Sequence, residues 1–150
     1  MLAKNSKVKT ILVACAAILA ISIFCVWENN AITTTQIQYV NPKIPEEFNG
    51  YRIVHISDLH NKLFGKAQER LLEKIRAVSP DIIVITGDLI DRRKFDLETA
   101  MVFVRGAVKI APVYYVSGNH EAWSGAYSNI SQALKSSGVH VLDDTKTTLV

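Results

Sequence analysis

The stretch "YRIVHISDLH" (Tyr51–His60) begins as an apolar run typical of a buried β-strand and ends with a carboxylate and an imidazole. Successive side chains of a strand point to opposite faces, so Asp58 and His60 are expected to share one face at the strand's end. His55 lies three residues before Asp58 and is expected on the other face, as an ordinary packed or surface histidine. Two polar groups at the end of a buried strand indicate a binding site.

Similar apolar runs recur downstream, separated by longer segments of helical period. The runs are "DIIVITG" (81–87), "APVYYVSG" (111–118) and the shorter "VHVL" (139–142). Between and after them, apolar residues recur every three to four positions, which predicts amphipathic helices. These residues are Ala67, Leu71, Ile75 and Val78, then Leu97, Met101, Val104 and Val108, then Tyr127, Ile130 and Leu134. This β-α-β-α-β-α-β order predicts an α/β fold with a mainly parallel sheet covered by helices.

Polar side chains follow each of the first three predicted strands, in "SDLH" (57–60), "GDLIDRR" (87–93) and "GNHE" (118–121). Ligands of parallel sheets bind at the carboxyl ends of the strands, so these groups are expected to meet at one edge. Each set alone has an ordinary explanation, since aspartates cap turns and helices and Gly-Asn is a common turn dipeptide. Together they place more histidine, aspartate, asparagine and arginine at one edge than turns require.

The side-chain types at this edge suit a divalent metal. Carboxylate oxygens, a neutral imidazole and an amide oxygen, with no thiolate, are typical ligands of Mn, Fe or Zn ions. Asp88 is the natural bridge, because its two oxygens can hold two ions about 3.5 to 4 Å apart. Such a pair lowers the pKa of a shared water and stabilises phosphoryl transfer. Arg92, with Arg93 beside it, offers positive charge to a phosphate oxygen.

The motifs "SDLH", "GDLIDR" and "GNHE", in this order and about thirty residues apart, resemble the first three motifs of the calcineurin-like metallophosphoesterases. The resemblance covers roughly residues 50–121. The lead-in "NPKIPEEFNG" (41–50) and an apolar N-terminus are similar to the bacterial membrane-anchored branch. The resemblance implies hydrolysis of phosphomonoesters or phosphodiesters, including lipid-linked ones, by a hydroxide that two divalent metals activate. It also implies an αββα sandwich, of which this chain supplies the N-terminal half.

The resemblance assigns four residues to the metals. Asp58 and His60 are expected to hold the first ion, and Asp88 to bridge both. Asn119 is expected to bind the second ion through its amide oxygen. In the family, a further histidine and a Gly-His-x-His motif from the second half complete both metal shells, and this sequence contains no such motif.

The resemblance assigns three other residues to catalysis. His120 is expected near the leaving-group oxygen, with Asp91 orienting it by a hydrogen bond. Arg92 is expected to contact the phosphate. Glu121 ends the third motif, where some members have Asp, and receives no metal role. His140 is expected to be an exposed strand residue rather than a ligand.

We therefore expect the 150-residue chain to be an N-terminal fragment of a phosphoesterase, with weak or no activity alone. It should expose one apolar sheet face and an open edge, and need its C-terminal half or a partner. An alternative is a non-catalytic, membrane-tethered interaction protein that retains the half-fold. A flavodoxin-like or nucleotide-binding domain also fits the β-α order, but a glycine-rich phosphate loop does not follow the first strand.

The first thirty residues form a separate segment, "VKTILVACAAILAISIFCVW" (8–27) with polar flanks. Its uninterrupted apolar part, Ile11–Trp27, has about the minimal length of 17 residues for a transmembrane helix. Lysines precede it and Glu28 follows it, so the positive-inside rule predicts a cytoplasmic N-terminus and an extracytoplasmic domain. A cleaved signal peptide is the alternative, but no small-x-small site follows. "LVAC" resembles a lipid-attachment box, but only four apolar residues precede its cysteine.

The cysteines and the charge of the sequence argue against a disulfide-stabilised domain and against a nucleic-acid-binding protein. Cys15 and Cys25 are the only cysteines and would lie about 15 Å apart on a helix, so they cannot form a disulfide with each other. The formal charge of +3 owes much to the basic N-terminus. The sequence has no stripe of Lys and Arg with interleaved aromatic residues, so we do not predict a nucleic-acid partner. Residues 31–50 are predicted to be a linker, or an edge strand at "TTTQIQYV" (33–40), before the phosphoesterase-like domain of residues 51–150.

Overall fold

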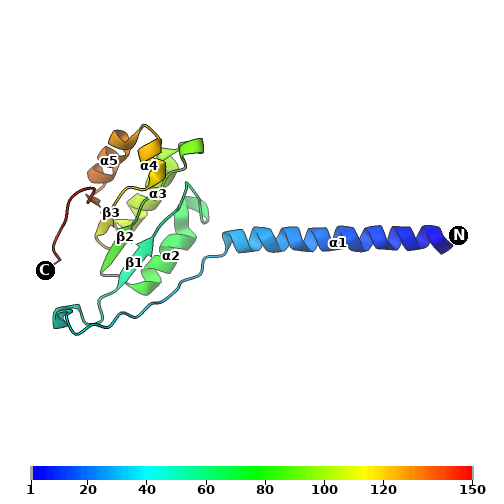
Figure 1. The fold of residues 1–150 in the computed structure, drawn as a ribbon, viewed down its shortest axis with the longest axis horizontal. Helices are drawn as coiled ribbons and strands as arrows, with labels where there is room; N and C mark the ends of the chain where they lie inside the picture. Colours follow the sequence, from blue (N-terminus) through cyan, green and yellow to red (C-terminus); the bar gives the residue numbers. More distant parts are fainter. Residues whose placement is uncertain (1, 150) are drawn as a thin grey trace. The chain divides into compact units, whose positions relative to one another are not determined.

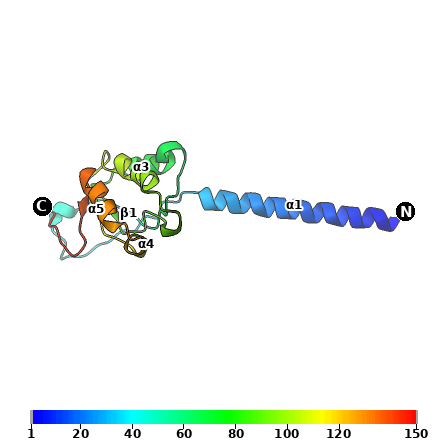
Figure 2. The ribbon, with the colours of Figure 1, turned by 90° about the horizontal axis from the view of Figure 1, so that it is seen from above.

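The computed structural model of the protein describes residues 2–149, with side chains from residue 7 onward (Figure 1). The chain divides into two compact units, Met1–Gln36 and Ile37–Val150. The first unit is built on one long helix, α1 (Leu2–Asn30), which is continuous in both views (Figure 1, Figure 2).

Helix α1 is predominantly apolar on all sides between Ile11 and Trp27. Its segment Lys7–Asn30 is long and apolar enough to cross a membrane, by length and composition. At 1.5 Å per residue these 24 residues extend about 36 Å, against about 30 Å for the hydrocarbon core of a bilayer. Cys15 and Cys25 are free and exposed, in agreement with the prediction that they do not pair. The α1 segment therefore has the physical properties that a membrane anchor requires.

The second unit contains one parallel sheet, and this confirms the predicted α/β class. Its strands in the described chain are β1 (Ile53–Ile56), β2 (Ile82–Ile85), β3 (Val113–Tyr115) and β4 (His140–Val141), in the spatial order β1-β2-β3-β4. The connecting helices are α2 (Glu69–Val78), α3 (Leu97–Ala107), α4 (Asn119–Trp123) and α5 (Tyr127–Ser136). Short 3-10 helices lie at Glu46–Phe48, Lys66–Gln68 and Arg92–Lys94.

Three details differ from the sequence-based expectations. Ala67 was placed on the face of the first amphipathic helix, but it has a left-handed backbone (φ 52°) and lies before α2. Residues 31–45, all described, contain no helix or strand, so the edge strand considered at "TTTQIQYV" does not form. Helix α4 was not expected, because "NHEAW" (119–123) is too short to show a helical period.

The helices cover one face of the sheet. Right-handed crossovers between consecutive parallel strands place all connecting helices on the same side, and α3 contacts both α2 and α5. On this side Ile83, Ile85 and Val113 are fully buried, and Phe103 of α3 and Leu134 of α5 are fully buried as well. Burying apolar area of this kind is the main stabilising contribution to the domain.

The opposite face of the sheet is more exposed, as the sequence predicted. The strand register aligns His55, Val84, Tyr114 and His140 in one row across this face. His55 and His140 are exposed there; the His55 Nε2 lies 2.6 Å from the Thr86 hydroxyl, and the Tyr114 ring stacks on His140. Neither histidine belongs to the polar cluster at the carboxyl ends of the strands.

Candidate metal centre

The loops that follow β1 and β2 run side by side beyond the carboxyl ends of the strands. The amide of His60 donates to the carbonyl oxygen of Asp88 over 2.9 Å, and the amide of Asn61 donates to that of Leu89 over 3.0 Å. A further bond runs from the amide of Asp58 to the carbonyl of Gly87. This backbone ladder fixes the first motif against the second.

Both loops adopt left-handed backbone conformations at non-glycine residues. The φ angles are 56° at Asp58, 46° at His60, 59° at Asn61 and 53° at Asp88. Each such residue costs roughly 1–2 kcal/mol, and strained residues of this kind cluster at functional sites. Strand β1 ends at Ile56, so Asp58 and His60 are brought together by sharp turns rather than by the strand alternation that the sequence suggested.

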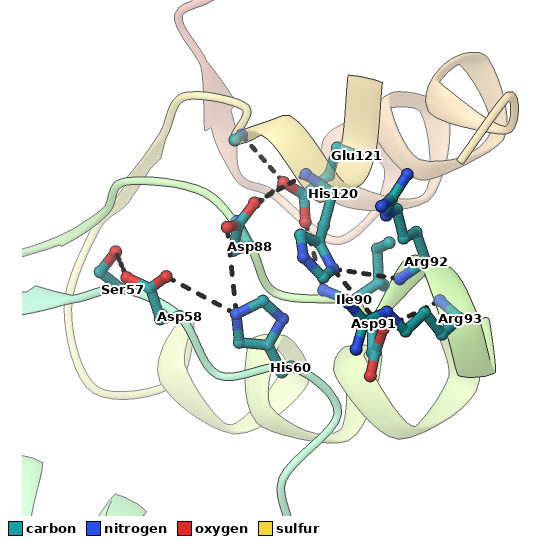
Figure 3. A network of polar contacts seen from close by, with 11 residues as sticks. Ser57, Asp58, His60, Asp88, Ile90, Asp91, Arg92, Arg93, His120 and Glu121 are labelled. Atoms are coloured by element: carbon teal, nitrogen blue, oxygen red, sulfur yellow. Dashed lines mark hydrogen bonds and ion pairs between the residues drawn. The ribbon is translucent and has the colours of Figure 1, made fainter. Parts of the chain in front are cut away.

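Three side chains converge at this edge of the sheet. His60, Asp88 and His120 each offer a ligand atom, and these atoms lie within 4.8 Å of one another (Figure 3). The Nε2 of His60 is 3.9 Å from Oδ2 of Asp88 and 3.6 Å from Oδ1 of Asp58. Asp88 is buried and the two histidines are partly buried, whereas the Asp58 side chain is 65% exposed. The predicted residues Asp58, His60 and Asp88 thus lie together.

The donor set fits a divalent metal. Ligand bonds of about 2.1 Å to one ion place two ligand atoms between about 3 and 4.2 Å apart, which covers both distances from His60 Nε2. Imidazole nitrogens with carboxylate oxygens suit Zn, Mn or Fe rather than soft metals. Asn119, the remaining predicted ligand, is the first residue of α4 and is exposed.

The carboxylate of Asp88 is held from the side of the third motif. Its Oδ1 accepts a hydrogen bond from the amide of His120 over 2.9 Å, which leaves Oδ2 on the side of His60. Gly118 makes this approach possible, because a Cβ at that position would lie 2.2 Å from Oδ1 of Asp88. The glycine of "GNHE" is therefore required by the position of the Asp88 carboxylate.

The ring of His120 is oriented differently from the expectation. Its Nδ1 accepts a hydrogen bond from the backbone amide of Arg92 over 3.2 Å, so a neutral ring carries its proton on Nε2. Oδ1 of Asp91 lies 3.6 Å from the same Nδ1, which is too long for a hydrogen bond. The amide of Arg92 thus takes the place of the expected hydrogen bond between Asp91 and His120.

Asp91 and Arg92 occupy the rim of the site. Asp91 accepts a hydrogen bond from the amide of Arg93, and this bond together with the positive charges of His120, His60 and Arg93 holds the pKa of Asp91 below its ordinary value. The Arg92 guanidinium lies 4.8 Å from the ring centre of Trp123, a cation–π contact. Trp123 is itself 62% exposed, so this pair faces solvent beside the cluster.

Two further carboxylates support the third motif, and sequence reasoning gave neither a role. Glu121 is fully buried and accepts hydrogen bonds from backbone amides. Asp143 accepts from both the amide (2.7 Å) and the hydroxyl (2.8 Å) of Ser117. For Glu121 a signal existed, since an acidic residue three positions after a helix N-cap commonly bonds back to the cap. For Asp143, 26 residues from its partner, no local pattern was available.

Sequence comparisons relate the chain to known metallophosphoesterases. The chain is 28% identical to an uncharacterized metallophosphoesterase of Campylobacter jejuni over 84% of its own length and 35% of the relative's. It is 30% identical to a bovine (Bos taurus) transmembrane protein with metallophosphoesterase domain, over 75% of the chain and 25% of the relative. It is 36% identical to the UDP-2,3-diacylglucosamine pyrophosphatase LpxG of Chlamydia trachomatis, over 47% of the chain and 23% of the relative.

The chain thus spans about a third or less of the length of these curated relatives. The sequence pattern of the calcineurin-like phosphoesterases matches residues 51–146, which is more than half of the chain and contains all three motifs. The chain therefore belongs to the calcineurin-like phosphoesterase family.

Proposed function

We propose that this chain belongs to a membrane-anchored enzyme that hydrolyses phosphate esters with two divalent metal ions. The observation that carries the proposal is the convergence of His60, Asp88 and His120 at the carboxyl edge of the sheet. Asp58, His60, Asp88 and Asn119 would hold these ions, with Asp88 as the ligand that both would share. Bound metal ions supply a water of lowered pKa and positive charge for the attacking and leaving oxygens.

The chain's own residues position the phosphate and handle the proton. His120 carries its proton on Nε2, because Nδ1 accepts from the amide of Arg92, and it can donate this proton to the leaving-group oxygen. The carboxylate of Asp91 lies beside this ring, 3.6 Å from Nδ1, as a positioning group. The Arg92 guanidinium, held over Trp123, binds a phosphate oxygen.

The substrate class is proposed as phosphomonoesters or phosphodiesters, including lipid-linked ones. Support comes from the similarity to LpxG, whose printed name is that of a UDP-2,3-diacylglucosamine pyrophosphatase, and from the apolar helix α1. Lys7 and Lys9 before the apolar core and Glu28 after it support our proposal that the catalytic domain lies on the extracytoplasmic side of the cell membrane.

The alternative function is a non-catalytic, membrane-tethered interaction protein. The exposed face of the sheet favours it, because Ile53, two residues before His55 in β1, is 57% exposed there. The two functions differ in whether Asp88 binds metal, since an interaction surface on the sheet face does not require the cluster at its edge.

Replacement of Asp88 by asparagine tests the proposed function. The full chain is purified in detergent micelles, and its Mn²⁺ binding is measured by electron paramagnetic resonance together with hydrolysis of a chromogenic phosphodiester. Asp88→Asn should lower Mn²⁺ affinity at least about tenfold and abolish any Mn²⁺-dependent turnover, because a bridging ligand is lost. Asparagine tolerates the left-handed backbone, so the fold is expected to persist.

Asp144→Asn is the matched control. Asp144 has the same φ of 53° as Asp88, and its replacement by asparagine is the same chemical change. Asp144 is exposed and lies outside the cluster. It should leave Mn²⁺ affinity unchanged. A wild-type chain that binds no Mn²⁺, or equal affinities for the wild type and Asp88→Asn, would refute the proposed site and favour the interaction protein.

A further inference from the structure

The third motif ends in Glu121, a carboxylate with no access to solvent. Its Oε2 accepts hydrogen bonds from the amides of Asp88 (2.8 Å) and Gly118 (2.9 Å), and its Oε1 accepts from the amide of Ile90 (3.2 Å) (Figure 3). Hydrogen bonds to an ionised acceptor are about twice as strong as neutral ones. A single buried side chain therefore fixes the backbone of both the second and the third motif.

The two motifs hold each other reciprocally. The backbone amide of Asp88 donates to the side chain of Glu121, and the side chain of Asp88 accepts from the backbone amide of His120. Each loop thus supplies a carboxylate to the main chain of the other. Because Oδ1 of Asp88 is occupied in this way, the direction of its Oδ2 depends on both bonds.

The backbone of Asp88 needs such support. Its φ of 53° lies in the left-handed region, which Asp tolerates better than most residues but which still costs free energy, so bonds from the surroundings help to hold it. Glu121 binds the amides of Asp88 and Ile90, which lie at and just after the strained residue. Without these bonds the loop can relax, and the Asp88 carboxylate would leave its place beside His60.

The charge of Glu121 acts in the same direction as its hydrogen bonds. The Glu121 carboxylate is hydrogen-bonded to the backbone amide of Asp88. It lies in a buried environment, where electrostatic interactions are weakly screened. A negative charge at this position attracts a cation held by the Asp88 carboxylate. The charge therefore supports metal binding although Glu121 is not a ligand.

We propose that Glu121 is a positioning residue of the metal centre, which fixes the Asp88 carboxylate toward His60 and so sets the affinity of the site for divalent cations without touching them. The inference rests on the proposed function, because it concerns the same site. It assigns a role in metal affinity to Glu121, the fully buried last residue of the "GNHE" motif.

The test compares Glu121→Gln with the wild-type full chain in detergent micelles. Glutamine has the same size but only one acceptor oxygen, and its NH₂ group would oppose a backbone N–H. The amides of Asp88, Ile90 and Gly118 should exchange hydrogen faster in the metal-free variant, by nuclear magnetic resonance. Mn²⁺ affinity, measured by electron paramagnetic resonance, should fall by about tenfold or more, as is typical when a residue that orients a ligand is replaced.

Two further variants separate positioning from general loss of stability. Val104→Ala removes methyl groups from a fully buried residue of α3, so it should lower the melting temperature without changing Mn²⁺ affinity. Glu121→Asp keeps the charge but shortens the side chain, so its Mn²⁺ affinity should lie between those of Glu121→Gln and the wild type.

The outcomes distinguish the inference from the proposed function. A wild-type chain that binds no Mn²⁺ refutes the metal centre itself, and the inference with it. A wild-type chain that binds Mn²⁺ while a folded Glu121→Gln binds it equally well refutes only the role of Glu121. An equal loss of affinity in Val104→Ala and Glu121→Gln at matched melting temperatures would reduce the role to stability and also refute it.

Discussion

The helix-covered face of the sheet and the loops at its carboxyl edge are stabilised by different interactions. On the covered face, regular strands and helices bury apolar side chains such as Phe103 and Leu134 completely. At the edge, Asp58, His60 and Asp88 have left-handed backbones, and hydrogen bonds to polar partners hold the loops in place. The difference implies that changes in the core alter stability, whereas changes at the edge alter binding.

The largest expected effect is that of a core truncation. Phe103→Ala should lower the free energy of unfolding by about 3–5 kcal/mol, because it leaves a cavity where a fully buried aromatic side chain of α3 was. Urea unfolding of the full chain in micelles, followed by circular dichroism, measures this loss. Phe95→Ala, at a residue that is 46% exposed, is the control and should change the free energy much less. Equal losses in both variants would contradict the assignment of the core.

A pair of glycines offers a sharper comparison, because both are packed too closely to accept a Cβ. At Gly118 the Cβ would lie 2.2 Å from Oδ1 of Asp88, and at Gly106 it would lie 2.3 Å from Cδ1 of Leu72. Both alanine variants should lose about 1–3 kcal/mol of stability through overpacking. Only Gly118→Ala should also weaken Mn²⁺ binding, by about tenfold, because it displaces a ligand.

Unfolding curves and Mn²⁺ titrations of the two variants check this expectation. If Gly106→Ala weakens Mn²⁺ binding as much as Gly118→Ala does, core and edge are coupled, and the division between stability and binding fails. If neither variant changes Mn²⁺ affinity, the position of the Asp88 carboxylate does not determine that affinity.

The same division explains how much could be predicted from the sequence. The sheet and its three long helices follow from apolar periodicity, which is a local property of the chain, and the motif spacing brought Asp58, His60 and Asp88 to one edge correctly. The polar bonds that shape the edge join distant residues, such as Asp88 with Glu121 and Ser117 with Asp143, and no periodicity encodes them. The predicted hydrogen-bond partner of His120, the Asp91 side chain, was wrong for this reason. The backbone amide of Arg92 donates to His120 instead.

Tyr115 belongs to both regions, and its replacement should have the smallest effect at neutral pH. It lies on the covered face of β3 and is 1% exposed, yet its hydroxyl has no hydrogen-bond partner among the described residues. Burial, with the negative charges of Glu121, Asp143 and Asp88, raises its pKa well above the ordinary value. Tyr115→Phe should therefore change the free energy of unfolding by less than about 1 kcal/mol at pH 7, because no hydrogen bond is lost.

The difference should grow in alkali. A group whose pKa is raised in the folded state contributes stability below its unfolded pKa, about 10 for tyrosine, and loses it as the pH rises further. The wild type should then lose up to about 1.4 kcal/mol per pH unit relative to Tyr115→Phe above pH 10. Urea unfolding at pH 7 and pH 11 measures the change. If the difference in free energy of unfolding between the wild type and Tyr115→Phe is the same at pH 7 and pH 11, the Tyr115 hydroxyl reaches water. The buried core would then end before the Tyr115 hydroxyl.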